Sequence, residues 1–131
     1  MWRSQATLKA TMNSTGWGEL VLETNPAQPD HSQAFSAGYL EAAMTPGMID
    51  MAWQNYLGQT APSAKVLGFV AKNNAWVTGM VRANPSDKYW IAVGEVYAQL
   101  AGMAAGYNAH RGGLNPLTAL EIQLLGAATS T

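Results

Sequence analysis

Few side chains of the types that carry out enzyme chemistry occur in this chain, and they do not pair in a catalytic pattern. His31 lies in a predicted loop and His110 at a predicted helix end, and neither has carboxylates at the spacing of metal ligands. Four serines lack the sequence context of a nucleophile elbow: Ser14, Ser32, Ser36 and Ser63. Cysteine is absent, which excludes a thiol nucleophile from these residues. We therefore predict no catalytic residue, no metal site and no cofactor in this chain.

Glu41 is the carboxylate whose surroundings are least suited to a charge. It stands in the run "AGYLEAA", among small and apolar residues. Burial raises the pKa of a carboxyl group unless a hydrogen-bond donor or a cation compensates. Two interpretations follow, a hydrogen-bonding brace between chains and a carboxylate in a substrate cleft, and the brace is favoured.

Trp17 lies between two glycines at the start of a predicted strand, in "NSTGWGELVLET". The glycines allow a bulge or the close approach of another strand. The indole is either a large core anchor or part of the wall of an acyl-binding cleft. We favour the core anchor, because most tryptophans of this kind contribute to packing.

Asn13 begins the triplet Asn13-Ser14-Thr15, which fits the acceptor pattern for N-linked glycosylation. The other Asn-X-Ser triplet, at Asn84, has proline in the middle and is excluded. The first triplet falls in a predicted turn, where an acceptor is accessible. We predict glycosylation at Asn13, provided that the protein enters a secretory route.

The elements that position these residues are a hairpin followed by helices. Two alternating segments on either side of a turn predict a β-hairpin over residues 5–24. Prolines and Asp30 then lead into a run of helical spacing. The predicted helices cover residues 31–44, 48–57, 63–82 and 87–109, with a last helix over residues 117–125.

The helix predicted over residues 87–109 carries small residues every four positions: Gly94, Ala98, Gly102 and Gly106. Each glycine inside a helix costs about 1 kcal/mol relative to alanine. A close helix–helix or helix–sheet contact along this ridge would offset that cost. We expect the helix to be covered on at least two sides.

The composition also points to a covered surface. Charged residues are 11% of the chain, against about 25% in ordinary soluble domains, and the net charge is −1. No basic field indicates nucleic acid, and no apolar run is long enough for a transmembrane helix. Met1 is not followed by a signal-like segment, which predicts either a cytosolic protein or a targeting sequence outside this chain. A second polypeptide is the favoured cover, and an uncharged monomer is the alternative.

Four segments in order resemble a known family. They are "NSTGWGELVLETN", "QAFSAGYLEAAMT", "YWIAVGEVYAQLAGMAAGYNA" and "LTALEIQLL". Together they are similar to the N-terminal part of the phospholipase B-like proteins, over residues 11 to about 125. The sequence departs from the family pattern at Ser36, where alanine is usual, and at Ala42, where glycine is usual.

The resemblance implies an N-terminal-nucleophile hydrolase with a four-layer αββα fold. Residues 1–131 would be a single segment, the small N-terminal chain of a protein that cuts itself into two chains. That segment is α+β, a hairpin plus about five helices, and a larger chain from the same precursor completes the fold. The larger chain's N-terminal cysteine would attack the acyl carbonyl. The resemblance also implies a lysosomal or secreted protein.

The substrate and the activity stay open at this point. The family name implies removal of acyl chains from phospholipids, whereas relatives of the same fold mostly cleave amides, so an acyl amide is the alternative substrate. A noncatalytic structural or binding glycoprotein is a second alternative. An independent all-helical interaction module is the least favoured, because it would have to fold alone with a thinly charged surface.

Overall fold

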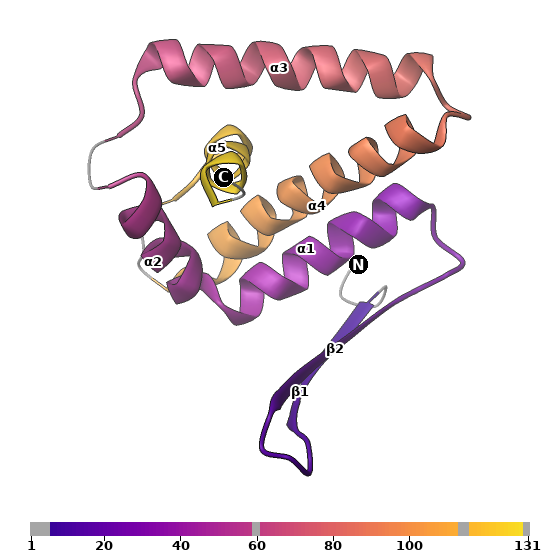
Figure 1. Ribbon diagram of the computed structural model, residues 1–131, viewed down its shortest axis with the longest axis vertical. Coiled ribbons are helices and arrows are strands. Elements are labelled where there is room, and N and C mark those ends of the chain that lie inside the picture. The colour runs from indigo at the N-terminus through magenta and orange to yellow at the C-terminus, as the bar shows by residue number, and fades with distance from the viewer. Residues whose placement is uncertain (1–5, 59–60, 113–115, 130–131) are drawn as a thin grey trace.

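The computed structural model describes residues 6–58, 61–112 and 116–129. The chain is α+β, with a two-stranded antiparallel hairpin followed by five helices in the described part (Figure 1). In order the elements are β1 (Ala6–Met12), β2 (Gly18–Thr24), α1 (Asp30–Met44), α2 (Pro46–Tyr56), α3 (Ala64–Ala83), α4 (Lys88–His110) and α5 (Ala119–Thr129). The predicted hairpin and the predicted order of helices are confirmed, although residue 5 lies outside the described residues.

Local sequence signals set the ends of the helices. The Ser63 hydroxyl accepts the backbone N–H of Val66 at 3.2 Å and begins α3. The Asp87 carboxylate accepts the N–H of Tyr89 at 2.9 Å and begins α4. Side-chain oxygens at these positions satisfy N–H groups that the first turn of a helix leaves unpaired. The interval between the helices predicted over residues 63–82 and 87–109 thus lies where α3 ends and α4 begins.

The turn of the hairpin explains the glycine before Trp17. Gly16 has φ +86°, in the left-handed region that favours glycine. Its N–H donates to the Asn13 carbonyl at 3.1 Å, and the N–H of Asn13 donates to the Trp17 carbonyl at 2.9 Å. This is a three-residue hairpin loop that ends in a left-handed residue, as glycine-containing loops of this length commonly do.

Helices α1 and α4 pack more closely than any other pair of helices in the described chain. A Cβ atom at Gly102 would fall on the Phe35 carbonyl, and one at Gly106 on the Tyr39 carbonyl. Gly38 meets the Gln99 carbonyl in the same way from the other helix. The close approach predicted from the small-residue ridge is therefore confirmed at these positions, and the helix that makes it belongs to the same chain.

The first glycine of the ridge, Gly94, packs against α3 instead of α1. A Cβ at Gly94 would lie 3.0 Å from a methyl group of Val81 on α3. The ridge of α4 is thus divided between two neighbours, α1 towards its C-terminal half and α3 towards its N-terminal half. The expected cover on two sides of α4 comes from this chain's own helices.

The core lies where α1, α2, α4 and α5 meet. Its buried residues come from these four helices and the segment before α5: Ala42, Ile49, Ala104, Tyr107, Leu117, Ile122 and Leu125. Tyr107 and Ile122 are each 1% exposed. The Asn108 side chain adds hydrogen bonds to both backbone groups of Leu117, at 2.6 and 3.0 Å, and so holds the segment before α5 on α4.

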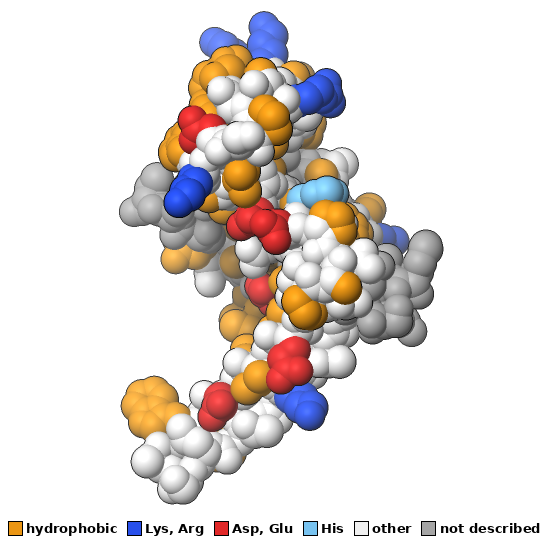
Figure 2. All heavy atoms as spheres, turned by 90° about the vertical axis from the view of Figure 1, so that its right-hand side faces the viewer, with side chains coloured by type: hydrophobic (Ala, Val, Ile, Leu, Met, Phe, Trp, Pro, Cys, Tyr) orange, Lys and Arg blue, Asp and Glu red, His pale blue; other side chains and the backbone are white. Residues whose placement is uncertain are grey.

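The hairpin and α3 lie at the periphery. Figure 1 shows the hairpin projecting away from the helices and α3 running along the opposite side. Of the twenty residues of α3 only Val70 and Val77 are buried. Large apolar side chains of both elements are exposed, among them Leu20, Phe69 and Trp76. Figure 2 shows hydrophobic side chains scattered over one face, with charged side chains of both signs among them.

Candidate functional site

The residues predicted as site candidates fall into two separate places. Asn13 and Trp17 lie at the turn between β1 and β2, and Glu41 lies in the C-terminal half of α1. Figure 1 shows the turn at the far end of the projecting hairpin, remote from α1. The described chain does not bring Trp17 and Glu41 into one cleft.

Trp17 is 74% exposed, so its favoured interpretation as a core anchor is wrong for this chain. The reason is the direction of the hairpin. The strands leave α1 after their first residues, and every residue from Lys9 to Val21 is exposed. The indole at the end of the hairpin therefore has no core of this chain to enter. Its role in a cleft wall stays a prediction.

Asn13 is exposed, and its side-chain oxygen is fully engaged. The Oδ1 atom accepts the Thr15 N–H at 3.0 Å, the Thr15 hydroxyl at 2.6 Å and the Trp17 N–H at 3.0 Å. None of these three contacts engages the amide nitrogen Nδ2. The acceptor triplet thus has an accessible geometry, and its glycosylation stays a prediction.

Glu41 is half-buried and joined to α4. Nε2 of Gln99 donates to its two carboxylate oxygens at 3.1 and 3.4 Å. Burial raises the pKa of Glu41 above its ordinary value, and the hydrogen bond from Gln99 lowers that pKa in part. The brace observed here connects α1 and α4 within this chain, whereas the predicted brace joined two chains. A cleft role for Glu41 stays a prediction.

The two histidines take structural positions. The ring of His110 packs edge-on against Tyr39, with the ring centroids 5.7 Å apart, and its Nδ1 lies 3.2 Å from the Gly106 carbonyl. This places it at the C-terminal end of α4, the predicted helix end, where a histidine complements the helix dipole. His31 is exposed at the start of α1. Within the described ranges, no group of three or more His, Cys, Asp or Glu residues has a metal-binding arrangement.

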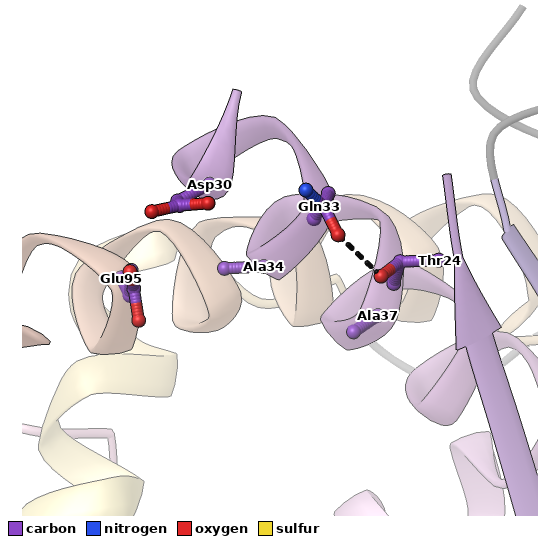
Figure 3. Close-up of a pocket in the computed structure, with 6 residues that line it drawn as sticks. All are labelled: Thr24, Asp30, Gln33, Ala34, Ala37 and Glu95. Carbon is purple, nitrogen blue, oxygen red and sulfur yellow. Dashed lines mark hydrogen bonds between the residues drawn. The ribbon is translucent and has the colours of Figure 1, made fainter. Parts of the chain in front are cut away.

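A shallow pocket of about 260 Å³ lies where β2, the first turns of α1 and the N-terminal half of α4 meet. Figure 3 shows its lining: Thr24, Asp30, Gln33, Ala34, Ala37 and Glu95. The Thr24 hydroxyl donates to Gln33 Oε1 at 2.6 Å, and Gln33 Nε2 donates to the Gln28 carbonyl at 2.8 Å. These bonds fix β2 to the start of α1. The remaining polar groups are the carboxylates of Asp30 and Glu95, which suit an ammonium or guanidinium group and would repel an oxyanion.

A larger groove of about 490 Å³ separates α3 from α4 and α5. Its lining is mostly apolar and includes Val66, Phe69, Val96, Leu100 and Leu124. Two hydrogen bonds cross it, from Asn73 Nδ2 to the Tyr97 hydroxyl at 2.9 Å and from Gln123 Nε2 to Asn74 Oδ1 at 2.8 Å. A groove with this lining accepts hydrocarbon, either an acyl chain or apolar side chains.

Sequence reasoning did not identify Gln99 as the partner of Glu41, since the two residues are 58 positions apart. It also did not anticipate the environment of Ser36, whose hydroxyl is completely buried on α1 without a hydrogen-bond partner among the described residues. The only signal at Ser36 is its departure from the alanine of the family pattern. Nothing in the structure explains this serine.

The comparisons with known proteins agree with the resemblance. The family model described as Phospholipase B matches residues 4–130. The chain belongs to this family.

Named relatives are similar over most of the chain. Phospholipase B-like protein B of Dictyostelium discoideum is 39% identical over 111 residues, which are 81% of this chain and 19% of the relative. Phospholipase B-like protein E of the same organism is 33% identical over 127 residues, 89% of this chain and 23% of the relative. A human phospholipase B-like protein is 30% identical in a match 135 residues long, which covers 92% of this chain and 23% of the human protein. The chain thus spans about a fifth of the length of these relatives.

The described part of this family member contains no helix that combines the length and apolar character needed to cross a bilayer. Its site candidates include no nucleophile paired with a general base. The features that remain are an acidic pocket, an apolar groove and an exposed hairpin.

Proposed function

We propose that this chain is part of a phospholipase B-like acyl hydrolase and that the catalytic nucleophile of the enzyme lies elsewhere. The observation that carries the proposal is the match of residues 4–130 to the Phospholipase B family. The absence of cysteine from all 131 residues means that a thiol nucleophile would have to lie on a larger partner chain. That thiolate would attack an acyl carbonyl, and this chain would complete the fold around it.

The distribution of apolar surface supports a partner. The hairpin pairs Ala6 with Thr24, Leu8 with Leu22, Ala10 with Leu20 and Met12 with Gly18, and opposite residues share a face. Apart from Thr24 at its inner end, this face consists of apolar side chains and glycine. Its first part packs near α1, whereas Leu20 and Met12 farther out are 69% and 70% exposed. An apolar strip that continues past its own core is typical of a surface completed by another part of the protein.

The substrate that we propose is a phospholipid whose acyl ester bond is cleaved. The apolar groove beside α3 supports a hydrocarbon ligand, because an acyl chain needs an apolar lining of this kind. We also propose that the protein is lysosomal or secreted. The exposed acceptor triplet at Asn13 supports that localisation.

The test begins with the full-length protein that contains this chain, purified in native form. Denaturing electrophoresis with N-terminal sequencing should give this chain and a larger one that begins with cysteine. The preparation should then release fatty acid from phospholipids faster than from matched acyl amides. The reverse preference would assign the acyl-amide alternative, and an uncleaved protein inactive on both would favour a noncatalytic glycoprotein and refute the proposal.

A further inference from the structure

The exposed indole of Trp17 does not belong to the apolar face of the hairpin. Side chains alternate between the two faces of a strand, so Trp17 lies on the same face as Glu19 and opposite to Leu20. The register of this second face pairs Thr11 with Glu19, Lys9 with Val21 and Thr7 with Glu23. An apolar partner that covers Leu20 and Met12 would therefore leave Trp17 uncovered.

Asn13 is the cross-strand neighbour of Trp17. The ladder ends with Met12 opposite Gly18, and the next backbone hydrogen bond runs from the Asn13 N–H to the Trp17 carbonyl at 2.9 Å. Opposite residues of an antiparallel pair have Cβ atoms about 5 Å apart on one face. The Cβ atoms of Asn13 and Trp17 are thus neighbours on this face.

The amide is also held in one orientation relative to the indole. Oδ1 of Asn13 accepts the N–H of Trp17 itself, in addition to the two groups of Thr15. The glycosidic bond of an N-linked glycan forms at the nitrogen Nδ2, which none of these contacts engages. The first sugar would therefore emerge beside the tryptophan ring instead of sampling many directions.

We propose that Trp17 is a stacking platform for the first N-acetylglucosamine of a glycan on Asn13. The C–H face of the sugar ring would lie on the indole, which offers a large apolar surface with little conformational entropy to lose. This contact accounts for a 74% exposed tryptophan on the mainly polar face of a projecting hairpin. The inference rests on the secretory localisation proposed above, and it is independent of the hydrolase chemistry.

The test uses the full-length protein expressed through the secretory route of a eukaryotic cell. Release of the Asn13 glycan by a peptide N-glycosidase is followed on the native protein by mass spectrometry of this site. Trp17→Ala should speed release about two- to tenfold, the range that corresponds to the loss of one aromatic stacking contact. Trp17→Phe should retain most of the protection. Trp76→Ala, at another exposed tryptophan, should leave the rate unchanged, and all rates should agree after denaturation.

A spectroscopic measurement gives a second readout. With the glycan trimmed to one ¹³C-labelled N-acetylglucosamine, stacking should shift the sugar resonances by the ring current of the indole, and Trp17→Ala should abolish the shift. An unoccupied Asn13, or an occupied one with unshifted resonances and an unchanged release rate in Trp17→Ala, would overturn the inference. Lipid hydrolysis by the same preparations is scored separately, so that failure of the glycan contact and failure of the proposed function are distinguished.

Discussion

The α1–α4 pair is tightly packed within this chain, whereas the outer part of the hairpin is exposed. Between the helices, the carbonyls of Phe35 and Tyr39 occupy the space that side chains at Gly102 and Gly106 would need. Along the hairpin, the outer apolar residues are exposed among the described residues, with Leu20 at 69%. The helical pair is specified by contacts inside these residues, whereas the outer part of the hairpin is exposed within the described chain.

The largest expected effect comes from adding a side chain between the two helices. Gly102→Ala places a Cβ on the backbone carbonyl of Phe35, which can move only if α1 moves. We expect the free energy of unfolding of the full-length protein to fall by about 1–3 kcal/mol or more, the range for overpacked interiors. Urea unfolding curves measure this loss.

Gly79→Ala on α3 is the matched control, because no atom lies within 4 Å of the added Cβ. Alanine is the better helix former by about 1 kcal/mol, so this variant should be equal to or more stable than the parent. Equal losses for Gly79→Ala and Gly102→Ala would contradict the special role given to the α1–α4 contact.

A smaller effect distinguishes the two faces of the hairpin. Leu20 and Val21 are neighbours in sequence that point to opposite faces. If the apolar face is covered in the full-length protein, Leu20→Ser should reduce the free energy of unfolding by about 2 kcal/mol, the value of one buried leucine. Val21→Ser should cost clearly less in the same urea titration, and equal small losses would mean that the apolar face is uncovered.

The smallest effect concerns the pH dependence of the α1–α4 contact. Burial raises the pKa of Glu41 above 4.5, so the folded protein holds this proton more firmly than the unfolded one. The contribution of Glu41 to stability is therefore most favourable at low pH and falls as the pH rises through the raised pKa. Glu41→Gln should match the parent near pH 4 and exceed it in stability at pH 7.

Gln99→Ala is the companion variant, since it removes the donor that lowers the pKa of Glu41. Between pH 4 and pH 7, the stability of Gln99→Ala should decline more steeply than that of the parent protein. Thermal unfolding midpoints across the pH range test both variants. A Glu41→Gln curve parallel to the parent would show that this carboxylate titrates as it does in the unfolded chain.

Local signals made most of the fold predictable. The caps at Ser63 and Asp87, the turn at Asn13–Gly16 and the glycine spacing of α4 act over a few residues each, and the structure contains all of them. Which helix would fill the glycine ridge depends on tertiary packing, which no local pattern encodes. The cover expected on at least two sides of α4 is provided by α1 and α3 of the same chain.

The site residues were harder to predict for the same reason. The local sequence around Trp17 favoured a position in the core, yet the direction of the hairpin leaves this residue exposed. The partner of Glu41, Gln99, is on another helix and could be found only from the fold. The acceptor pattern at Asn13 depends on three consecutive residues and a turn, so its accessible position was predictable.

The central claim is that residues outside this chain cover the apolar face of the hairpin, and oxidative footprinting of the full-length protein tests it most directly. Met12 on that face is 70% exposed in this chain, and Met103 packs against the core. The account predicts that hydroxyl radicals or peroxide oxidise Met12 as slowly as Met103, with both becoming equally reactive after denaturation. Rapid oxidation of Met12 in the native protein, at the rate of the denatured chain, would contradict it.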